Sequence, residues 1–178
     1  YLKSLSPKLA VSPVLKSNAY GHGLVEVAKI LDQENCPYFC VDSLHEAYQL
    51  YRAGIKTSIL IMGYINPENL KVKRLPFSYA VYDLEYLRKI HHYQPKAGIH
   101  LKVDTGMHRM GIPIQELEKL LIEIKKIKGL KIEGLMSHLA TVKDPQFSLQ
   151  LKNFRKAKDL LNKYGFHDPR MSPCFAMS

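Results

Sequence analysis

The sequence predicts an α/β protein built as an incomplete (β/α)8 TIM-type barrel of about seven βα units. Short apolar runs of strand length alternate with amphipathic stretches of helical spacing along the chain. Such alternation favours a parallel sheet wrapped by helices. The units are about 25 residues long and share no recurring motif, which favours a barrel over a repeat solenoid. A full barrel takes roughly 250 residues. We therefore expect residues 1–178 to form one partial barrel domain, a fragment that lacks the eighth strand.

The expected elements follow from the spacing of apolar residues. The strands are placed at 11–15, 38–41, 58–62, 79–82, 98–103, 131–136 and 171–176. The helices between them are placed at 24–33, 44–53, 67–73, 84–91, 114–127 and 147–164. The last two helices are the best defined, because apolar residues recur at steps of three and four. Examples are Leu117, Leu121 and Ile124, and then Leu151 and Phe154.

Local signals mark where several of these helices begin and end. Asp42-Ser43 and Asp83 come directly before helices, where a side-chain oxygen can accept from a free backbone amide. Gly129 and Gly165 follow helices, at a position that commonly takes a left-handed conformation. We therefore expect N-caps at the first set of positions and left-handed glycines at the second.

Composition and charge exclude several classes of protein. Hydrophobic residues make up 46% of the chain, enough for a sizeable core. No uninterrupted run of about 18 apolar residues exists, so we expect no membrane span and no membrane partner. The net charge of +10 would suit a nucleic-acid partner. However, the basic residues are spread over helix faces, as at Lys119 and Lys125, and we interpret them as solvated faces that bind no nucleic acid.

The three cysteines, Cys36, Cys40 and Cys174, form an odd set without the spacing of zinc ligands. We interpret them as free thiols, which are typical of a reducing compartment, and we expect no metal. The predicted location is therefore cytoplasmic.

Lys16 ends the first predicted strand and opens a glycine-rich turn, KSNAYGHG at 16–23. A predicted parallel strand is followed by a helix here, and α/β folds commonly have their active-site residues at such a junction. A lysine directed inward from a strand end can be desolvated, which lowers its pKa and frees the amine for Schiff-base formation. Taken alone, such a lysine is most often exposed to solvent. The eight-residue pattern around it therefore decides its interpretation.

This pattern resembles the cofactor-lysine signature of the alanine racemase family, whose members use pyridoxal 5′-phosphate (PLP). Ser17 stands where the family usually has alanine. The resemblance implies that Lys16 binds PLP covalently and serves in catalysis. It also implies that the phenol of Tyr20 hydrogen-bonds the cofactor phosphate.

The stretch HLKVDTGMHRMG at 100–111 resembles the racemase segment in which an arginine follows D-T-G-M and one further residue. The resemblance implies that Arg109 donates to the phenolic oxygen of PLP and approaches the substrate carboxylate, tasks that suit a planar, permanently charged guanidinium. Lys102 matches a lysine that is often carbamylated in this family, where the carbamate anion would hold Arg109. An unmodified Lys102 paired with an acidic neighbour is the alternative. His108 replaces the family's usual glycine.

Two further stretches support the resemblance. EGLMSHLAT at 133–141 resembles the segment whose histidine packs and hydrogen-bonds beneath the cofactor ring, which implies this role for His138. On its own, a histidine at a strand end would be interpreted as structural. PCFAMS at 173–178 ends in Ser178, which matches a serine that binds the cofactor phosphate, although Met177 replaces the asparagine before it. Barrels commonly hold phosphate after strands seven and eight.

The resemblance implies an isomerase that interconverts L- and D-alanine through a PLP aldimine and supplies D-alanine for bacterial peptidoglycan. PLP would be the electron sink, and Lys16 one of two bases. In the family the other base is a tyrosine from the C-terminal β domain of a second subunit, so the full-length protein is expected to be a homodimer. We expect this chain to lack that domain and to be inactive alone.

Three alternatives stay open at this point. Another PLP barrel of the same fold type, such as a racemase of different specificity, a decarboxylase or a PLP carrier, is one alternative. A decarboxylase or a PLP carrier would lack the NAYGHG continuation after Lys16. A non-catalytic remnant would form no adduct with PLP at this lysine. A basic RNA-binding module is a more distant alternative, which salt-dependent binding would reveal.

Overall fold

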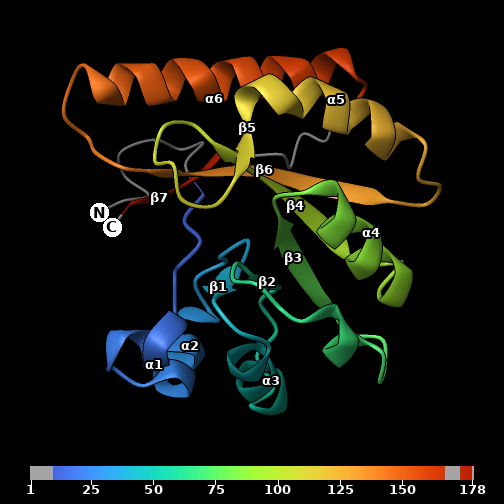
Figure 1. Cartoon of the computed structure of the whole chain (residues 1–178). Coiled ribbons are helices and arrows are strands. Elements are labelled where there is room, and N and C mark those ends of the chain that lie inside the picture. Colours follow the sequence, from blue (N-terminus) through green and yellow to red (C-terminus); the bar gives the residue numbers. More distant parts are fainter. Residues whose placement is uncertain (1–9, 167–172, 178) are drawn as a thin grey trace. The chain divides into compact units, whose positions relative to one another are not determined.

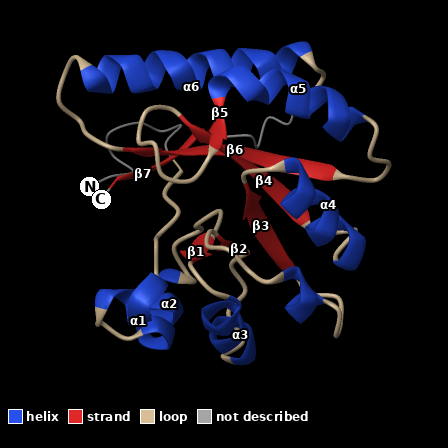
Figure 2. Cartoon of the chain, in the orientation of Figure 1, coloured by secondary structure: helices blue, strands red, loops and turns tan. Residues whose placement is uncertain are grey.

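The structure, a computed structural model, describes residues 10–166 and 173–177. The chain forms two compact units, Tyr1–Tyr79 and Ala80–Ser178. Both units contain parallel strands with helices between them, so the predicted α/β class is confirmed (Figure 1, Figure 2). Within the described ranges, no helix combines the length and the apolar character that a bilayer crossing requires.

The first unit contains short parallel strands, which are β1 (Phe39–Val41), β2 (Ile59–Ile61) and the beginning of β3 (Phe77–Val81). In the pairing register, Ile59 lies opposite Phe39 on one side and Phe77 on the other. Every residue of these strands is buried. Burial on both faces is typical of parallel strands that helices cover.

The predicted strand at 11–15 is wrong as an extended element. Within residues 10–15, only Val14 makes a β-bridge, a parallel one to Cys40. Leu15 donates its amide to the Cys40 carbonyl (2.8 Å), and the Cys40 amide donates to the Pro13 carbonyl (2.9 Å). Pro13 has no amide hydrogen with which to extend the ladder, and the backbone becomes left-handed at Ser17. Pro13 and the left-handed turn therefore confine the pairing with Cys40 to one residue.

Besides the left-handed segment α1 (Lys16–Tyr20), the helices described in the first unit are α2 (Leu24–Leu31), α3 (Leu44–Arg52) and a short 3-10 helix, η2 (Pro67–Leu70). Ser43 caps α3, as predicted, and forms a capping box with Glu46. The longer helix predicted at 67–73 is wrong. Asn66 caps the start of η2, and Pro67 and Leu70 are the buried residues of η2. Their spacing of three suits a single 3-10 turn.

The second unit contains the remaining strands, which are β4 (Gly98–Asp104), β5 (Ile112–Pro113), β6 (Lys131–Leu139) and β7 (Pro173–Met177). β6 lies between β4 and β7, and all these pairings are parallel. β5 pairs with the end of β4, where Val103 lies opposite Ile112. The sequence did not predict β5, because a two-residue strand has no periodicity of its own.

The helices of the second unit are α4 (Leu84–Tyr93), α5 (Ile114–Lys125) and α6 (Gln146–Lys163). Asp83 caps α4 by accepting from the Tyr86 amide (2.7 Å), which confirms the predicted cap. Gly129 and Gly165 have φ values of 75° and 81°, which confirms the predicted left-handed glycines. Figure 1 shows α5 and α6 side by side along β4 and β6, and the two helices contact each other and these strands.

His100 and Lys102 share one face of the β4–β6 pair. His100 lies opposite Gly134, and Lys102 opposite Met136, with a register shift just before His100. A Cβ atom at Gly134 would lie 2.2 Å from Nδ1 of His100, so the strand pair needs a glycine there to admit the imidazole. Leu101, between these residues on β4, is directed to the opposite face, because side chains alternate along a strand.

Candidate active site

A left-handed turn follows Lys16 in the first unit. The segment Lys16–Tyr20 (α1) contains consecutive left-handed residues, because Ser17, Asn18 and Ala19 have φ/ψ values near 54°/50°, 55°/44° and 51°/47°. Tyr20 continues the run with a φ of 55°. None of them is glycine, and this conformation costs roughly 1–2 kcal/mol for each such residue. Strain of this kind clusters at ligand-binding and catalytic sites, and here it follows directly on the half-buried Lys16.

Hydrogen bonds inside the turn hold this conformation. Asn18 accepts from the Gly23 amide at its carbonyl (3.0 Å) and from the Leu24 amide at its Oδ1 (2.8 Å). Its side chain therefore satisfies a free amide at the start of α2. Gly21 and Gly23 have φ values of 91° and 94°, which favour glycine. The turn thus joins Lys16 directly to α2.

Glu46 fixes the beginning of the turn from outside. Its Oε1 accepts from the Ser17 amide (2.7 Å), and its Oε2 accepts from the amides of Asp42 (2.9 Å) and Ser43 (3.0 Å). One carboxylate therefore ties the turn after Lys16 to the end of β1 and the start of α3. Glu46 was not among the predicted site residues. The Ser43-x-x-Glu46 spacing was the available signal, since it is the pattern of a capping box.

Tyr20 is exposed over 62% of its surface. Its phenol therefore lies on the accessible side of the turn, while Ala19 is buried beneath it. The turn presents Lys16 and Tyr20 from one short segment of the first unit. The other predicted site residues that the structure describes belong to the second unit.

Arg109 lies on a loop between β4 and β5 and is exposed. The loop leaves β4 at Asp104 and returns beside it at Gly111. A Cβ atom at Gly111 would lie 2.6 Å from the backbone nitrogen of Asp104, so only glycine permits this close return. Because Ile112 then pairs with Val103, both ends of the Arg109 loop are fixed to the same strand.

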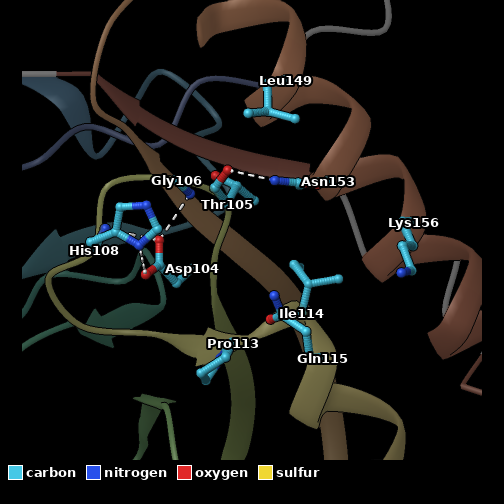
Figure 3. Close-up of a pocket in the computed structure, with 10 residues that line it drawn as sticks. All are labelled: Asp104, Thr105, Gly106, His108, Pro113, Ile114, Gln115, Leu149, Asn153 and Lys156. Atoms are coloured by element: carbon cyan, nitrogen blue, oxygen red, sulfur yellow. Dashed lines mark hydrogen bonds and ion pairs between the residues drawn. The ribbon is translucent and has the colours of Figure 1, made fainter.

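Asp104 organises the first half of this loop. Its Oδ1 accepts from the amides of Gly106 (2.9 Å), Met107 (3.0 Å) and His108 (3.1 Å). The His108 ring lies beside the same carboxylate, with Nδ1 3.4 Å from Oδ2 (Figure 3). Partial burial acts to raise the pKa of Asp104, but these amides and the His108 ring outweigh it and hold the pKa below its usual value. The carboxylate therefore stays ionised and keeps the loop closed.

A hollow of about 440 Å³ lies beside the loop, between the start of α5 and α6. Figure 3 shows Asp104 and His108 on one side of it, Gln115 on another, and Leu149 and Lys156 on α6. The hollow thus borders the loop that carries Arg109 but is not lined by that residue.

Lys102 and His138 share one face of the sheet in the second unit. Lys102 pairs with Met136, and His138 lies two residues further along β6, so its side chain projects from the same face. Lys102 is only 7% exposed, whereas His138 is half-buried. His100 belongs to this face as well, and its burial lowers its pKa to about 4, although Glu133 acts in the opposite direction.

The predictions on cysteine, metal and phosphate sites have different outcomes. Neither Cys36 nor Cys40 forms a disulfide bond with a described residue. Over residues 10–166 and 173–177, no three His, Cys, Asp or Glu side chains gather in a way that could hold a metal ion. The predicted phosphate ligand Ser178 lies outside the described residues, and so does the side chain of Cys174.

Comparison with known families gives a match along almost the whole chain. The family described as "Alanine racemase, N-terminal domain" matches residues 1–176. The alanine racemase of Carboxydothermus hydrogenoformans is 37% identical over 179 residues, which cover 92% of this chain and 48% of that protein. The alanine racemase of Methanococcus maripaludis is 34% identical over 163 residues, which cover 88% of this chain and 44% of that protein. The chain spans about half the length of these curated relatives.

Solved structures give the same answer. Alanine racemase from Clostridium difficile 630 superimposes with a TM-score of 0.88 at 31% identity, over 99% of this chain and 51% of that one. Alanine racemase from Bacillus anthracis, solved with bound L-Ala-P, gives a TM-score of 0.85 at 29% identity, over 98% of this chain and 47% of that one.

Proposed function

This chain belongs to the alanine racemase N-terminal domain family, and we propose that it is the PLP-binding part of an enzyme that interconverts L- and D-alanine. The observation that carries the proposal is the half-buried Lys16 at the head of a strained left-handed turn. A fold retains several strained non-glycine residues only where the surroundings over-determine them, and such places are typically functional.

The donor groups of the predicted site fit PLP by their chemistry. PLP carries an aldehyde, a phenolic oxygen and a phosphate, and when bound it supplies an electron sink for a carbanion beside the substrate nitrogen. The amine of Lys16 would hold the cofactor covalently and take up or release the substrate proton at its Nζ. The guanidinium of Arg109 would donate to the phenolic oxygen and the substrate carboxylate. Arg109 is exposed on its loop, which supports access to a ligand.

The remaining site residues would bind and orient. Tyr20 would donate its phenol to the phosphate, and its high exposure supports access to a ligand. Ser178 would donate to the same phosphate, and His138 would pack beneath the cofactor ring. These two roles rest on the family resemblance. A partial PLP-binding barrel domain over residues 1–178 is part of the same proposal.

Lys102 would act through Arg109. Lys102 is 7% exposed. Carbamylation would turn this cation into an anion that could hold the guanidinium of Arg109. We propose the carbamate on the family resemblance, with an unmodified Lys102 paired with an acidic neighbour as the alternative.

Alanine as the substrate and a homodimer as the assembly of the whole protein are also proposals, supported by the family. The poor activity expected of residues 1–178 alone stays a prediction, as does the cytoplasmic location.

Trapping with borohydride tests the cofactor site directly. The chain is mixed with PLP, reduced with borohydride and digested, and the modified lysines are identified by mass spectrometry. We expect the pyridoxyl group mainly at Lys16 and its loss in Lys16→Ala. Lys29, which is exposed on α2 in the same unit, is the internal reference for random modification. Equal labelling of Lys16 and Lys29 would contradict the proposal.

Substrate tests separate the proposed function from its alternatives. The protein that contains this chain should racemise L- and D-alanine. Turnover of diamines or other amino acids in preference to alanine would instead indicate a decarboxylase or a racemase of different specificity.

A further inference from the structure

Two loops that carry or follow predicted site residues are held by a single helix. The first is the loop of Arg109, between β4 and β5. The second begins at Ala140, two residues after His138. The helix is α6, which follows both loops in the chain and which our sequence analysis described only by its apolar residues.

Asn153 holds the first loop. Its Nδ2 donates to the carbonyl of Thr105 (3.0 Å), as Figure 3 shows. The hydroxyl of Thr105 is buried and lies 2.7 Å from the hydroxyl of Ser137, which donates to the Val103 carbonyl (2.9 Å). Thr105 is therefore fixed by its hydroxyl to β6 and by its carbonyl to α6. Arg109 follows four residues later, so the path of the loop toward it begins at a fixed residue.

Gln150 holds the second loop. Its Oε1 accepts from the Ala140 amide (2.7 Å), and its Nε2 donates to the carbonyls of Thr141 and Gln146 (both 3.2 Å). Gln150 is 2% exposed. Its buried amide group therefore satisfies both its donor and its acceptor atoms with hydrogen bonds. Gln150 also contacts the first loop, because a Cβ atom at Gly106 would lie 3.2 Å from its Cγ.

Gln150 and Asn153 are three residues apart and therefore lie on one face of α6. We propose that they are positioning residues, which together fix the Arg109 loop and the segment after His138 on the same helix. The proposal rests on the proposed function, because it gives these loops their role in cofactor binding. The physical claim itself concerns backbone order and can be measured without a cofactor.

Asn153→Asp tests the first contact with little change of shape. The variant keeps the size of the side chain but loses the N–H group that reaches Thr105. Asn162→Asp is the matched control, because Asn162 is an exposed residue of the same helix and undergoes the same change of charge. Hydrogen exchange measured by mass spectrometry reports the amides of Gly106, Met107 and His108, which Asp104 otherwise protects.

We expect exchange at residues 106–108 to be about tenfold faster in Asn153→Asp, as the loss of one half-buried hydrogen bond implies. Asn162→Asp should match the unaltered chain, and the amides of β4 should be unaffected in both variants. Unchanged exchange at 106–108 in Asn153→Asp, or an equal acceleration throughout β4, would overturn the proposal.

Gln150→Met provides an independent arm, since methionine has a similar length but no amide. Exchange at Ala140 should become faster while β4 stays protected. Unchanged protection at Ala140 would overturn the role of Gln150.

A PLP titration then tests the consequence for the site. The dissociation constant for PLP should rise about fivefold or more in Asn153→Asp and stay unchanged in Asn162→Asp. If the loop loosens but the PLP affinity is unchanged, the positioning role is refuted. If the unaltered chain binds no PLP, the proposed function fails together with this role, and the exchange data still decide whether α6 holds the loops.

Discussion

We expect Glu46→Ala to release the turn that begins at Lys16. The carboxylate of Glu46 accepts from the backbone amides of Ser17, Asp42 and Ser43. Hydrogen bonds to a charged group contribute about 1.5–3 kcal/mol when well buried. These amides are exposed or half-buried, so about 1 kcal/mol for each bond is the appropriate scale. Loss of all three should lower the free energy of unfolding by about 3 kcal/mol.

Ser43→Ala is the matched control. It removes the hydroxyl that accepts from the Glu46 amide (3.2 Å), which should cost about 1 kcal/mol, and it leaves the carboxylate in place. Urea unfolding followed by circular dichroism measures both variants. A difference of about 2 kcal/mol between them would be the contribution of the amides that Glu46 holds outside the helix cap. Equal losses in the two variants would refute the reasoning.

The same change should act on Lys16 itself. The left-handed residues after it cost roughly 1–2 kcal/mol each, so the turn depends on outside contacts to persist. Without Glu46, the Ser17 amide loses its partner, and hydrogen exchange at Ser17 should become faster in Glu46→Ala than in Ser43→Ala. The preference of PLP for Lys16 over Lys29 should fall in parallel. Retained preference together with fast exchange at Ser17 would mean that the turn does not position the amine.

Three more outcomes follow from the second unit. The pKa of Asp104 lies below its usual value, so its stabilising effect is fully present above about pH 4 and is lost as the pH falls through the lower, folded value; carboxyl NMR should give its inflection below that of an unfolded peptide. Gly111→Ala should lower the free energy of unfolding by on the order of 3 kcal/mol, because its Cβ would lie 2.6 Å from a backbone atom. Gly129→Ala meets nothing within 4 Å and should lower it by about 1 kcal/mol. Thermal or urea unfolding measures both variants. With ¹³C-labelled bicarbonate, the chain should give a carbamate NMR signal that Lys102→Met removes and Lys96→Met retains; a signal unchanged by Lys102→Met would assign it elsewhere.

Much of the fold is predictable because its signals are local. The caps at Ser43 and Asp83 are set by side chains that reach backbone amides a few residues away, and helix periodicity records which face is buried. The strand predicted at 11–15 fails because other features of the same segment outweigh its apolar residues. Its apolar residues suit a strand, but Pro13 and the left-handed turn limit how far the backbone can pair with Cys40.

The candidate site is predictable in part. Lys16 and Arg109 stand in stretches whose order of residues is specific, whereas the residues that hold their loops carry no such pattern. Gln150 did leave a signal, because it occupies the buried face of α6 together with Phe154, Ala157 and Leu161. The predicted spacing of apolar residues placed Leu151 on that buried face, but Leu151 is only half-buried. A buried amide in an apolar stripe needs partners, yet the sequence alone does not say that they belong to the loops after β4 and β6.

A common arrangement explains how each unit presents a predicted cofactor-binding side chain. In both, a carboxylate gathers backbone amides: Glu46 at the turn after Lys16, and Asp104 in the loop before Arg109. Backbone order is thereby obtained without using the side chains of Lys16 or Arg109. A backbone that is fixed before the ligand arrives suits a binding site, because the ordering cost of the loop is then already met.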